Sequence, residues 1–526
     1  MKLIVWMFVA LLMPFGGMTA VFNVRDFGAV GDGVADDTDS IRKAAAKLAE
    51  AKGGELLFPL GDYRTAGRGA ILTFKEVSNL TIRFENGARL LVDNLKSDGS
   101  GNGHGIHIAG PAHDIALLNV TVEWMKRPRK RSFGDGIRFD GFPKDDRTIE
   151  RIQMLSCRVV NAPQAGAIFH GCSNVVVRNF RPEKTLADGL HFNACRRVLA
   201  DGVFGVENGD DTLAFVTYFS KGSIGAYGGT RPPYTQPGLY GWSNTDSFAN
   251  NIVTNGGKAC GVRVSGGKNI TVSNVSVLQK WYGVQIDAAR KTTADRAVGW
   301  SYLASQNITF RNVSVRNCAT GVTVRTLNLE MDDPVEEWRP ESLVFDNLNI
   351  SNCKKGLMLR DTSGILVSRL WSDSPVRVIN NRGRIALREV VLKNSNLEIL
   401  GTQNGKVQAF NRSREGEPFV AADDLSDLVP RELTLSGVEV ENGRILLKNC
   451  AGVRMKQVAF RGSGEGALQL EKVRDSLVDT VSFTEIPAGC ASVIDAVNCR
   501  DVELRNFGKA PIAPALLQSY PVLQKH

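Results

Sequence analysis

Cysteine and proline are scarce in this sequence, and their scarcity limits the kinds of protein that it can encode. The chain has 526 residues, of which nine are Cys and 19 are Pro. Nine Cys are too sparse for a disulfide scaffold of this length, and their spacings include no C-x-x-C pattern that would predict a metal site. The composition, with 43% apolar residues and 53 Gly, is that of a globular protein and excludes a disordered or collagen-like chain.

Excess charge and long hydrophobic runs are also nearly absent. The 64 Lys and Arg against 55 Asp and Glu leave a net charge of +9, which weakly favours an acidic partner and does not predict nucleic-acid binding. One long apolar run, Leu3 to Phe15, is followed by small residues up to Ala20. It predicts a signal peptide over residues 1–20 and a secreted or periplasmic protein. An uncleaved anchor is the alternative, but the run is short for a membrane span, so no membrane partner is expected after cleavage.

The rest of the chain repeats a strand pattern. Apolar residues recur at offsets 0, +2, +5 and +7, as in Ile115, Leu117, Val120 and Val122. Alternation within each half predicts a strand with one buried face. Further copies begin at Ile270, Ile308, Leu343, Ile385, Leu433 and Val453. Copies at intervals of 20 to 25 residues, or about twice that, predict the stacked coils of a β-helix. Asn residues at the bends between the halves suit a left-handed backbone conformation.

A second strand follows in each coil and has a five-residue motif. Its first residue is of any type, its second is Gly, and its third and fifth are apolar, so that the fourth residue points outward. The outward residues are His107, Arg138, Ile168, His191, Ala214, Arg263, Gln285, Thr323 and Met358. The first residues of the motif are His104, Asp135, Ala165, Asp188, Asp211, Cys260, Tyr282, Thr320 and Lys355; in the copy that starts at Asp211, Thr replaces the Gly. In a parallel stack the members of each column lie about 4.8 Å apart. Ionisable groups concentrate in the earlier coils of both columns.

The N-terminal region differs from the repeats. A helix is predicted over Ser40 to Lys52, followed by Gly53 and Gly54 as its end. The preceding run from Asp26 to Thr38, with the sequence DFGAVGDGVADDT, resembles the N-terminal cap of pectin-lyase-like β-helix proteins. The resemblance implies an all-β, right-handed parallel β-helix with one α-helix in its cap. We expect the cap and first strands at 21–75, the β-helix at 76–515 and a tail at 516–526, and we interpret the acidic residues of the run as capping groups.

Three carboxylates are candidates for chemistry. Asp188 and Asp211 hold the same position in coils 23 residues apart, and Asp210 directly precedes Asp211. Three carboxylates this close cannot all ionise freely, so at least one pKa is expected to be raised. Glycoside hydrolysis uses a carboxylic acid beside a carboxylate, and stacked coils can provide the gap of ~6.5–9.5 Å that inversion requires. The alternative is an Asp ladder at a bend, with or without a bound cation; spacing alone leaves both open.

The spacing of Asp188-Gly189 and Gly209-Asp210-Asp211 is similar to the catalytic motifs of polygalacturonases and of related α-1,3-galactosidases. This resemblance covers residues 186–215 and implies that Asp210 is the proton donor and that Asp188 and Asp211 act on water, with no cofactor and no metal. Two departures favour a neutral or differently charged sugar over polygalacturonate. No Gly-His-Gly follows the Asp pair, and Ser265 stands where those enzymes have the Lys that holds the carboxylate.

Other side chains are candidates for contact with a sugar. The predicted substrate-binding residues are His191, Arg263, Tyr282, Asp135, Arg138 and Trp242. His191 and Arg263 can donate to hydroxyl or carboxylate groups, whereas Asp135 and Arg138 lie two coils back, where a loop can shield them. Trp242 ends an aromatic-rich insertion that starts at Tyr218, and aromatic faces suit sugar rings. The basic run from Lys126 to Arg131 is expected to be a solvated loop, with a clamp for an acidic or sulfated glycan as the alternative.

Together these patterns predict a secreted, inverting glycoside hydrolase that acts on a poly- or oligosaccharide, with galactose- and uronate-containing glycans as candidates. The first alternative is a polysaccharide lyase, which needs a base near the α-proton of a uronate and a cation that neutralises its carboxylate. The second is a carbohydrate-binding β-helix without catalysis. Neither the leading prediction nor its alternatives require a nucleic-acid partner.

Overall fold

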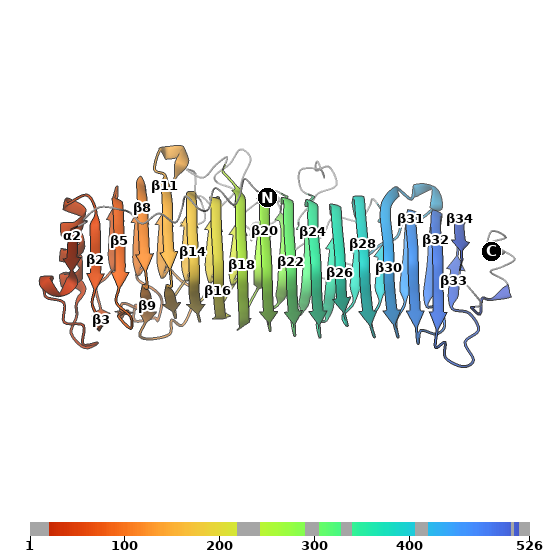
Figure 1. Cartoon of the computed structure of the whole chain (residues 1–526), viewed down its shortest axis with the longest axis horizontal. Helices are drawn as coiled ribbons and strands as arrows, with labels where there is room; N and C mark the ends of the chain where they lie inside the picture. Colours follow the sequence, from red (N-terminus) through yellow and green to blue (C-terminus); the bar gives the residue numbers. More distant parts are fainter. Residues whose placement is uncertain are drawn as a thin grey trace. The chain divides into compact units, whose positions relative to one another are not determined.

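Parallel β-strands make up most of the protein in the computed structural model (Figure 1). The structure describes residues 20–217, 242–289, 304–327, 339–404, 419–506 and 510–514, which contain 34 β-strands and one α-helix. The predicted fold class is therefore confirmed. The signal segment up to residue 19, most of the insertion at 218–241 and the C-terminal tail lie outside the described residues. Within the described ranges, no helix has the length and hydropathy that a membrane span needs.

The chain divides into two compact units, residues 1–272 and 273–526. In the first unit, the strands pair in parallel in three ladders. The first ladder contains β1 (Val21–Asn23), β2 (Gly54–Phe58), β5 (Ser78–Phe84), β8 (Ala112–Leu118), β11 (Ile149–Leu155), β14 (Cys172–Glu183), β16 (Arg196–Asn208) and β18 (Asn244–Gly257). The second contains β3 (Asp62–Thr65), β6 (Arg89–Val92), β9 (Thr121–Trp124) and β12 (Arg158–Val160). The third, which we call the site ladder because it carries the candidate functional residues, contains β4 (Leu72–Lys75), β7 (Ile106–Ala109), β10 (Ile137–Asp140), β13 (Ala167–His170), β15 (Leu190–Asn193), β17 (Leu213–Val216) and β19 (Cys260–Ser265).

The second unit also consists of parallel strands, which form two ladders that both pair with β31, and β20 (Gly267–Leu278) contains the boundary between the units. One series of strands in the second unit is β21 (Tyr282–Ala289), β23 (Thr320–Leu327), β25 (Lys355–Arg360), β27 (Val376–Ile379), β29 (Leu397–Leu400) and β33 (Ile494–Val497). The other series is β22 (Gln306–Arg316), β24 (Glu341–Ser351), β26 (Ser363–Ser372), β28 (Arg382–Lys393), β30 (Pro430–Glu441) and β34 (Arg500–Arg505). The long strands β31 (Ile445–Arg461) and β32 (Leu468–Thr484) complete the unit. All nine Cys are free thiols, seven of them buried.

The N-terminal cap is built around one helix. The 3-10 helix η2 (Val24–Phe27) leads to α2 (Thr38–Glu50), which packs against β1 and β2 (Figure 1) and begins and ends two residues before the prediction. The carboxylate of Asp37 does not cap the helix through a side-chain bond. It accepts hydrogen bonds from the N–H groups of Val30 and Gly31, at 2.6 and 3.0 Å. The acidic run thus fixes the turn that leads into the helix.

The predicted register holds along the site ladder. Arg138 of β10 pairs with His107 of β7 and Ile168 of β13, and the pairing continues from Ile168 to His191 of β15. It then continues from His191 to Ala214 of β17 and from Ala214 to Arg263 of β19. Beneath this column, Phe139, Phe169, Phe192 and Phe215 stack in the core with ring centroids 4.4 to 5.1 Å apart. Aromatic stacking of this kind stabilises the register.

Backbone geometry explains two residue types of the repeats. Asn119, Asn274, Asn312 and Asn347 have φ values between 54° and 60°, the left-handed conformation that Asn tolerates. The Gly residues that open the site-ladder strands are needed for close stacking. A Cβ at Gly105, Gly136, Gly166 or Gly189 would lie 2.5 to 2.7 Å from a backbone oxygen of the next coil.

We therefore expect Gly189→Ala to destabilise the protein. Its Cβ would lie 2.7 Å from the carbonyl oxygen of Thr212, so the two coils would have to separate, at a cost of about 1–3 kcal/mol. Gly464→Ala is the control, since its Cβ would meet only Pro487, at an ordinary 3.4 Å. Urea denaturation of both variants checks this, and equal midpoints for Gly189→Ala and the wild type would contradict it.

Candidate functional site

Acidic side chains at the start of the site-ladder strands hold the next coil in place. Oδ1 of Asp188 accepts a hydrogen bond from the backbone N–H of Asp211, and Oδ1 of Asp211 accepts one from Cys260, both at 3.0 Å. Asp135 does the same with the N–H of Ala165. An Asp ladder, the alternative to catalysis, is therefore present. It uses one oxygen of each carboxylate and leaves the other oxygen for further contacts.

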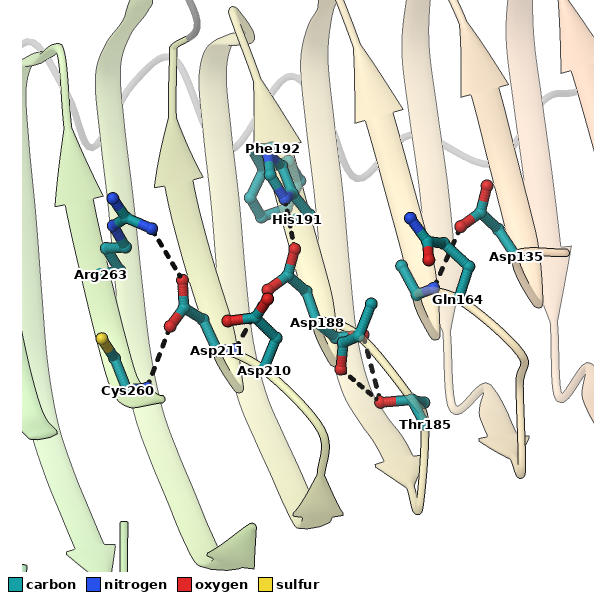
Figure 2. Close-up of polar contacts among 12 residues, drawn as sticks. Asp135, Gln164, Thr185, Asp188, His191, Phe192, Asp210, Asp211, Cys260 and Arg263 are labelled. Carbon is teal, nitrogen blue, oxygen red and sulfur yellow. Dashed lines mark hydrogen bonds and ion pairs between the residues drawn. The ribbon is translucent and has the colours of Figure 1, made fainter. Parts of the chain in front are cut away.

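Two carboxylates of this ladder, Asp188 and Asp211, form a cluster with Asp210 (Figure 2). One oxygen from each of Asp188, Asp210 and Asp211 lies within 4.8 Å of the others. The three residues come from the turns before β15 and β17, so the register brings them together as predicted. The distance of 4.8 Å joins one chosen oxygen of each residue and does not measure the separation of the carboxyl groups, so the gap of ~6.5–9.5 Å stays a prediction.

Each carboxylate has a different cationic or polar neighbour. Oδ2 of Asp188 lies 2.6 Å from Nδ1 of His191, which is three residues later on β15. Oδ2 of Asp211 lies 3.8 Å from the guanidinium of Arg263, and Arg263 also donates to Oγ of Ser265 at 3.2 Å. Figure 2 shows Arg263 beside Asp211 and His191 beside Asp188. Both predicted binding residues thus contact the predicted catalytic group that lies beside them.

The three acids also differ in exposure. The side chain of Asp210 is 27% exposed, whereas that of Asp188 is 10% and that of Asp211 only 4% exposed. A group that gives a proton to a glycosidic oxygen has to come within hydrogen-bond reach of it. Of the three, Asp210 is therefore the carboxylate that a bound glycan could approach most easily.

Burial and charge move two pKa values in opposite directions. Burial raises the pKa of Asp211 to about 7; the negative charges of Asp210 and Asp188 add to this effect, and Arg263 opposes it. Burial would also raise the pKa of Asp188, but its interaction with His191, the charge of Arg131 and the N–H of Asp211 together hold that pKa below its ordinary value. The predicted raised pKa is confirmed, and it belongs to Asp211.

Carboxylate oxygens at this spacing can also attract a divalent cation. Several of their coordination positions are already in use, since Asp188 and Asp211 accept backbone N–H groups and Asp188 also contacts His191. A guanidinium supplies positive charge at Asp210. We assign no cation to the cluster, and a mechanism without metal or cofactor stays a prediction.

Arg131 is the functional candidate that the repeat pattern missed. Its guanidinium contacts Oδ2 of Asp210 at 2.5 Å and donates to Oε1 of Gln164 at 3.2 Å. It belongs to the basic run at 126–131, which was predicted to be a solvated loop or a glycan clamp. The run itself was the available signal, but the two residues are 79 positions apart and Arg131 is not part of a strand. Strand register therefore could not predict the contact.

Asp135 and Arg138 lie in a separate polar group below a loop. Arg138 bridges Asp135 and Asp140, at 3.0 and 2.9 Å, and both Asp135 and Arg138 are buried. The ring of Phe133 stands 4.5 Å from that of His104, which contacts Asp135. Phe133 thus covers His104, the neighbour of Asp135, and the shielding of Asp135 and Arg138 by a loop stays a prediction. Their role in substrate binding is not supported, because both side chains are buried and are paired with each other.

The two predicted aromatic contacts lie elsewhere. Trp242 packs against the guanidinium of Arg196, 3.9 Å from its ring centroid. Arg196 begins β16, so this contact is at the opposite end of β15 from Asp188. Tyr282 begins β21 in the second unit, where its ring centroid is 5.0 Å from the guanidinium carbon of Arg325. The aromatic residues of the insertion before Trp242 lie outside the described residues.

Fold and site together define a parallel β-helix with an acidic cluster on one ladder, and comparison with known proteins supports the resemblance of its N-terminal segment to pectin-lyase-like proteins. Residues 21–71 match the family described as rhamnogalacturonase A/epimerase, pectate lyase-like. The mannuronan C5-epimerase AlgE5 of Azotobacter vinelandii is 50% identical over 46 residues, which are 9% of this chain and 5% of the epimerase. The chain thus matches only a small part of the length of this relative.

Solved structures resemble a larger share of the chain. A family 28 exopolygalacturonase of Yersinia enterocolitica is 15% identical, with 93% of this chain and 79% of the enzyme aligned and a TM-score of 0.42. Gene product 12 of bacteriophage phi29 is 13% identical, with 90% of this chain and 57% of that protein aligned and a TM-score of 0.52. At this identity, the likeness to the phage protein bears on the fold alone.

The raised pKa of Asp211 predicts a pH-dependent gain in stability for Asp211→Asn. A carboxyl whose folded pKa is about 7, against about 3.9 when unfolded, holds its proton more tightly in the folded state. Wild-type stability therefore falls as pH rises from about 4 to 7. We expect the variant to melt several degrees above the wild type at pH 8 and to match it at pH 4, as measured by calorimetry.

Asp501→Asn is the control for this experiment, because that side chain is 70% exposed and its replacement removes the same charge. A melting temperature for Asp211→Asn that does not differ from the wild type at pH 8, or that falls there, would contradict the assignment of the raised pKa.

Proposed function

We propose that this protein is a secreted glycoside hydrolase that cleaves a poly- or oligosaccharide with inversion. The observation that carries the proposal is the cluster of Asp188, Asp210 and Asp211, in which the pKa of one buried acid is raised and that of another is lowered. Carboxyl groups whose environments separate their pKa values are what acid–base hydrolysis of a glycosidic bond needs. We infer inversion from the resemblance of the Asp motifs to those of polygalacturonases, because the distances between the carboxylate oxygens do not by themselves distinguish inversion from retention.

In the proposed reaction, Asp210 gives its proton to the glycosidic oxygen, because it is the most exposed of the three acids. The bond from this oxygen to the anomeric carbon breaks. A water molecule held by Asp188 and Asp211 attacks that carbon from the other face and transfers a proton to them. His191 and Arg263 hold these two carboxylates, and Arg263 can also bind a sugar hydroxyl group. No step requires a cofactor.

Carbohydrate as the substrate class is supported by the Asp motifs and by the name of the curated relative, an epimerase of mannuronan. Alginate lyase 7 of Azotobacter vinelandii is also 50% identical to this chain over 46 residues. A polysaccharide lyase is therefore the second candidate, with Arg131 or Arg263 as the cation that neutralises a uronate. Export through the segment at residues 1–20 is part of the proposal, since the substrate would lie outside the cell.

The proposal predicts that Asp210→Asn lowers glycan turnover by about 10²–10⁴-fold, the usual contribution of a general acid. The measurement is release of reducing sugar from a panel of galactosides, galacturonans and sulfated algal glycans, with Asp501→Asn as an exposed control. NMR of the fresh product should show an inverted reducing end. Unsaturated products that absorb ultraviolet light would instead establish a lyase, and full turnover by Asp210→Asn would overturn the assignment of Asp210.

A further inference from the structure

The basic segment, residues 126–131, has five cationic side chains and no acidic one. Two of its cations pair with a carboxylate, Lys130 with Asp98 at 2.7 Å and Arg131 with Asp210 at 2.5 Å. The other three are exposed and have no acidic partner within the described ranges; they are Lys126, Arg127 and Arg129. Like charges that are close together repel one another. A negatively charged partner therefore explains this group of cations better than the stability of the segment does.

The coils on either side hold the backbone of the basic segment in place. The N–H of Arg129 donates to the carbonyl oxygen of Gly99, and the N–H of Ser132 donates to that of Pro163, both at 3.0 Å. Oγ of Ser132 accepts a hydrogen bond from the N–H of Gly101 at 2.9 Å. Because these bonds already order the backbone, less entropy is lost when the side chains bind a ligand.

The ion pair between Arg131 and Asp210 places the basic segment beside the acidic cluster. Arg131 also donates to Oε1 of Gln164 at 3.2 Å. Consecutive Cα atoms are 3.8 Å apart, so the Cα of Arg129 lies within about 8 Å of that of Arg131, and the Cα of Arg127 within about 15 Å. When one sugar of a glycan lies at the acidic cluster, its neighbours in the glycan can therefore reach the unpaired cations.

An exposed aromatic ring follows the basic segment. Phe133 is 55% exposed, and its ring centroid lies 4.5 Å from that of the buried His104. The Phe residues that stack under the site ladder, such as Phe139, are fully buried instead. An exposed aromatic face can pack against a sugar ring. The segment and Phe133 together thus offer an ionic contact and an apolar contact to the same ligand.

We propose that the basic segment and Phe133 form a binding surface for an anionic glycan, whose sulfate or carboxylate groups lie on sugars next to the one that is cleaved. The proposal deepens the proposed function and rests on it. A guanidinium binds such oxyanions through paired N–H donors, and Arg127 and Arg129 supply two guanidinium groups. The charged groups lie on neighbouring sugars because the acidic cluster repels negative charge at the cleaved bond.

A glycan fits this surface better than a nucleic acid does. A strand of DNA carries one phosphate per about 3.4 Å, so a strand that covered both the segment and the cluster would bring phosphates against three carboxylates. A glycan can instead present hydroxyl groups to these carboxylates and its charged groups to the segment. Single-stranded DNA is therefore the competing ligand in the test.

The test compares Arg127→Gln/Arg129→Gln, which removes two charges, with Arg127→Lys/Arg129→Lys, which keeps them. Arg382→Gln/Arg384→Gln is the matched control, because these two Arg are also exposed, two positions apart and without an acidic partner in the described structure. All substitutions are made in Asp210→Asn, so that the glycan stays intact. Biolayer interferometry measures binding to a sulfated galactan, a galacturonan, a neutral galactan and single-stranded DNA, each at low and high salt.

The parent Asp210→Asn should bind the sulfated galactan or the galacturonan more tightly than the neutral galactan, and salt should weaken this binding because it screens the charges. Loss of two exposed ion pairs in the Gln variant should weaken it by about 2- to 30-fold, whereas the Lys variant and the control stay near the parent. Phe133→Leu should also weaken it, and Phe133→Tyr, which keeps the ring, should not. Binding of one anionic glycan alone would support the proposal and identify the group as sulfate or carboxylate.

Three results would overturn the proposal: equal binding of neutral and anionic glycans or no binding of either anionic one, a loss in the control as large as in the Gln variant, and tighter binding of DNA than of any glycan. The proposed function is tested separately. If binding depends on the segment but the wild type cleaves no glycan, the surface stands and the hydrolase is wrong. If the wild type cleaves only neutral glycans, the hydrolase stands and the surface is wrong.

Discussion

The site depends on one requirement, that every buried backbone N–H group finds an acceptor. At the turns before the site-ladder strands, the N–H of one coil is accepted by the side chain of the coil before it, as with Asp188 and Asp211. The bond from Cys260 to Asp211 repeats this arrangement one coil later. One oxygen of each of these two carboxylates is fixed in this way, and both residues also contribute an oxygen to the cluster with Asp210. Two of the residues that stabilise the stack are therefore also members of the cluster.

Close packing of the three acids places their carboxyl groups in different environments. Among the described residues, the nearest cation to the buried Asp211 is Arg263 at 3.8 Å, whereas Asp188 and Asp210 have partners at 2.6 and 2.5 Å. Burial and the neighbouring carboxylates raise the pKa of Asp211, while that of Asp188 is lowered. The difference in environment explains how adjacent residues of one type can take different roles.

The features of the fold and site that depend on strand periodicity could be predicted from the sequence. The period of two and the repeat of the Gly motif gave the outward column from His107 to Arg263, and the register confirms it within the first unit. Contacts made by loops could not be predicted in this way, since their reach depends on packing between segments far apart in sequence. Strand periodicity therefore predicts for Arg131 only a solvated or clamping role. For the same reason it could not predict that Asp135 is buried and ion-paired with Arg138 instead of exposed to a sugar.

The central claim is that the cluster is where a glycan is cleaved. Its most direct test is a crystal structure of Asp210→Asn with the glycan found by the activity screen. The account predicts a glycosidic oxygen within hydrogen-bond distance of residue 210 and a water molecule between Asp188 and Asp211. A glycan bound on another face, or a metal ion held at the centre of the three acids, would contradict it.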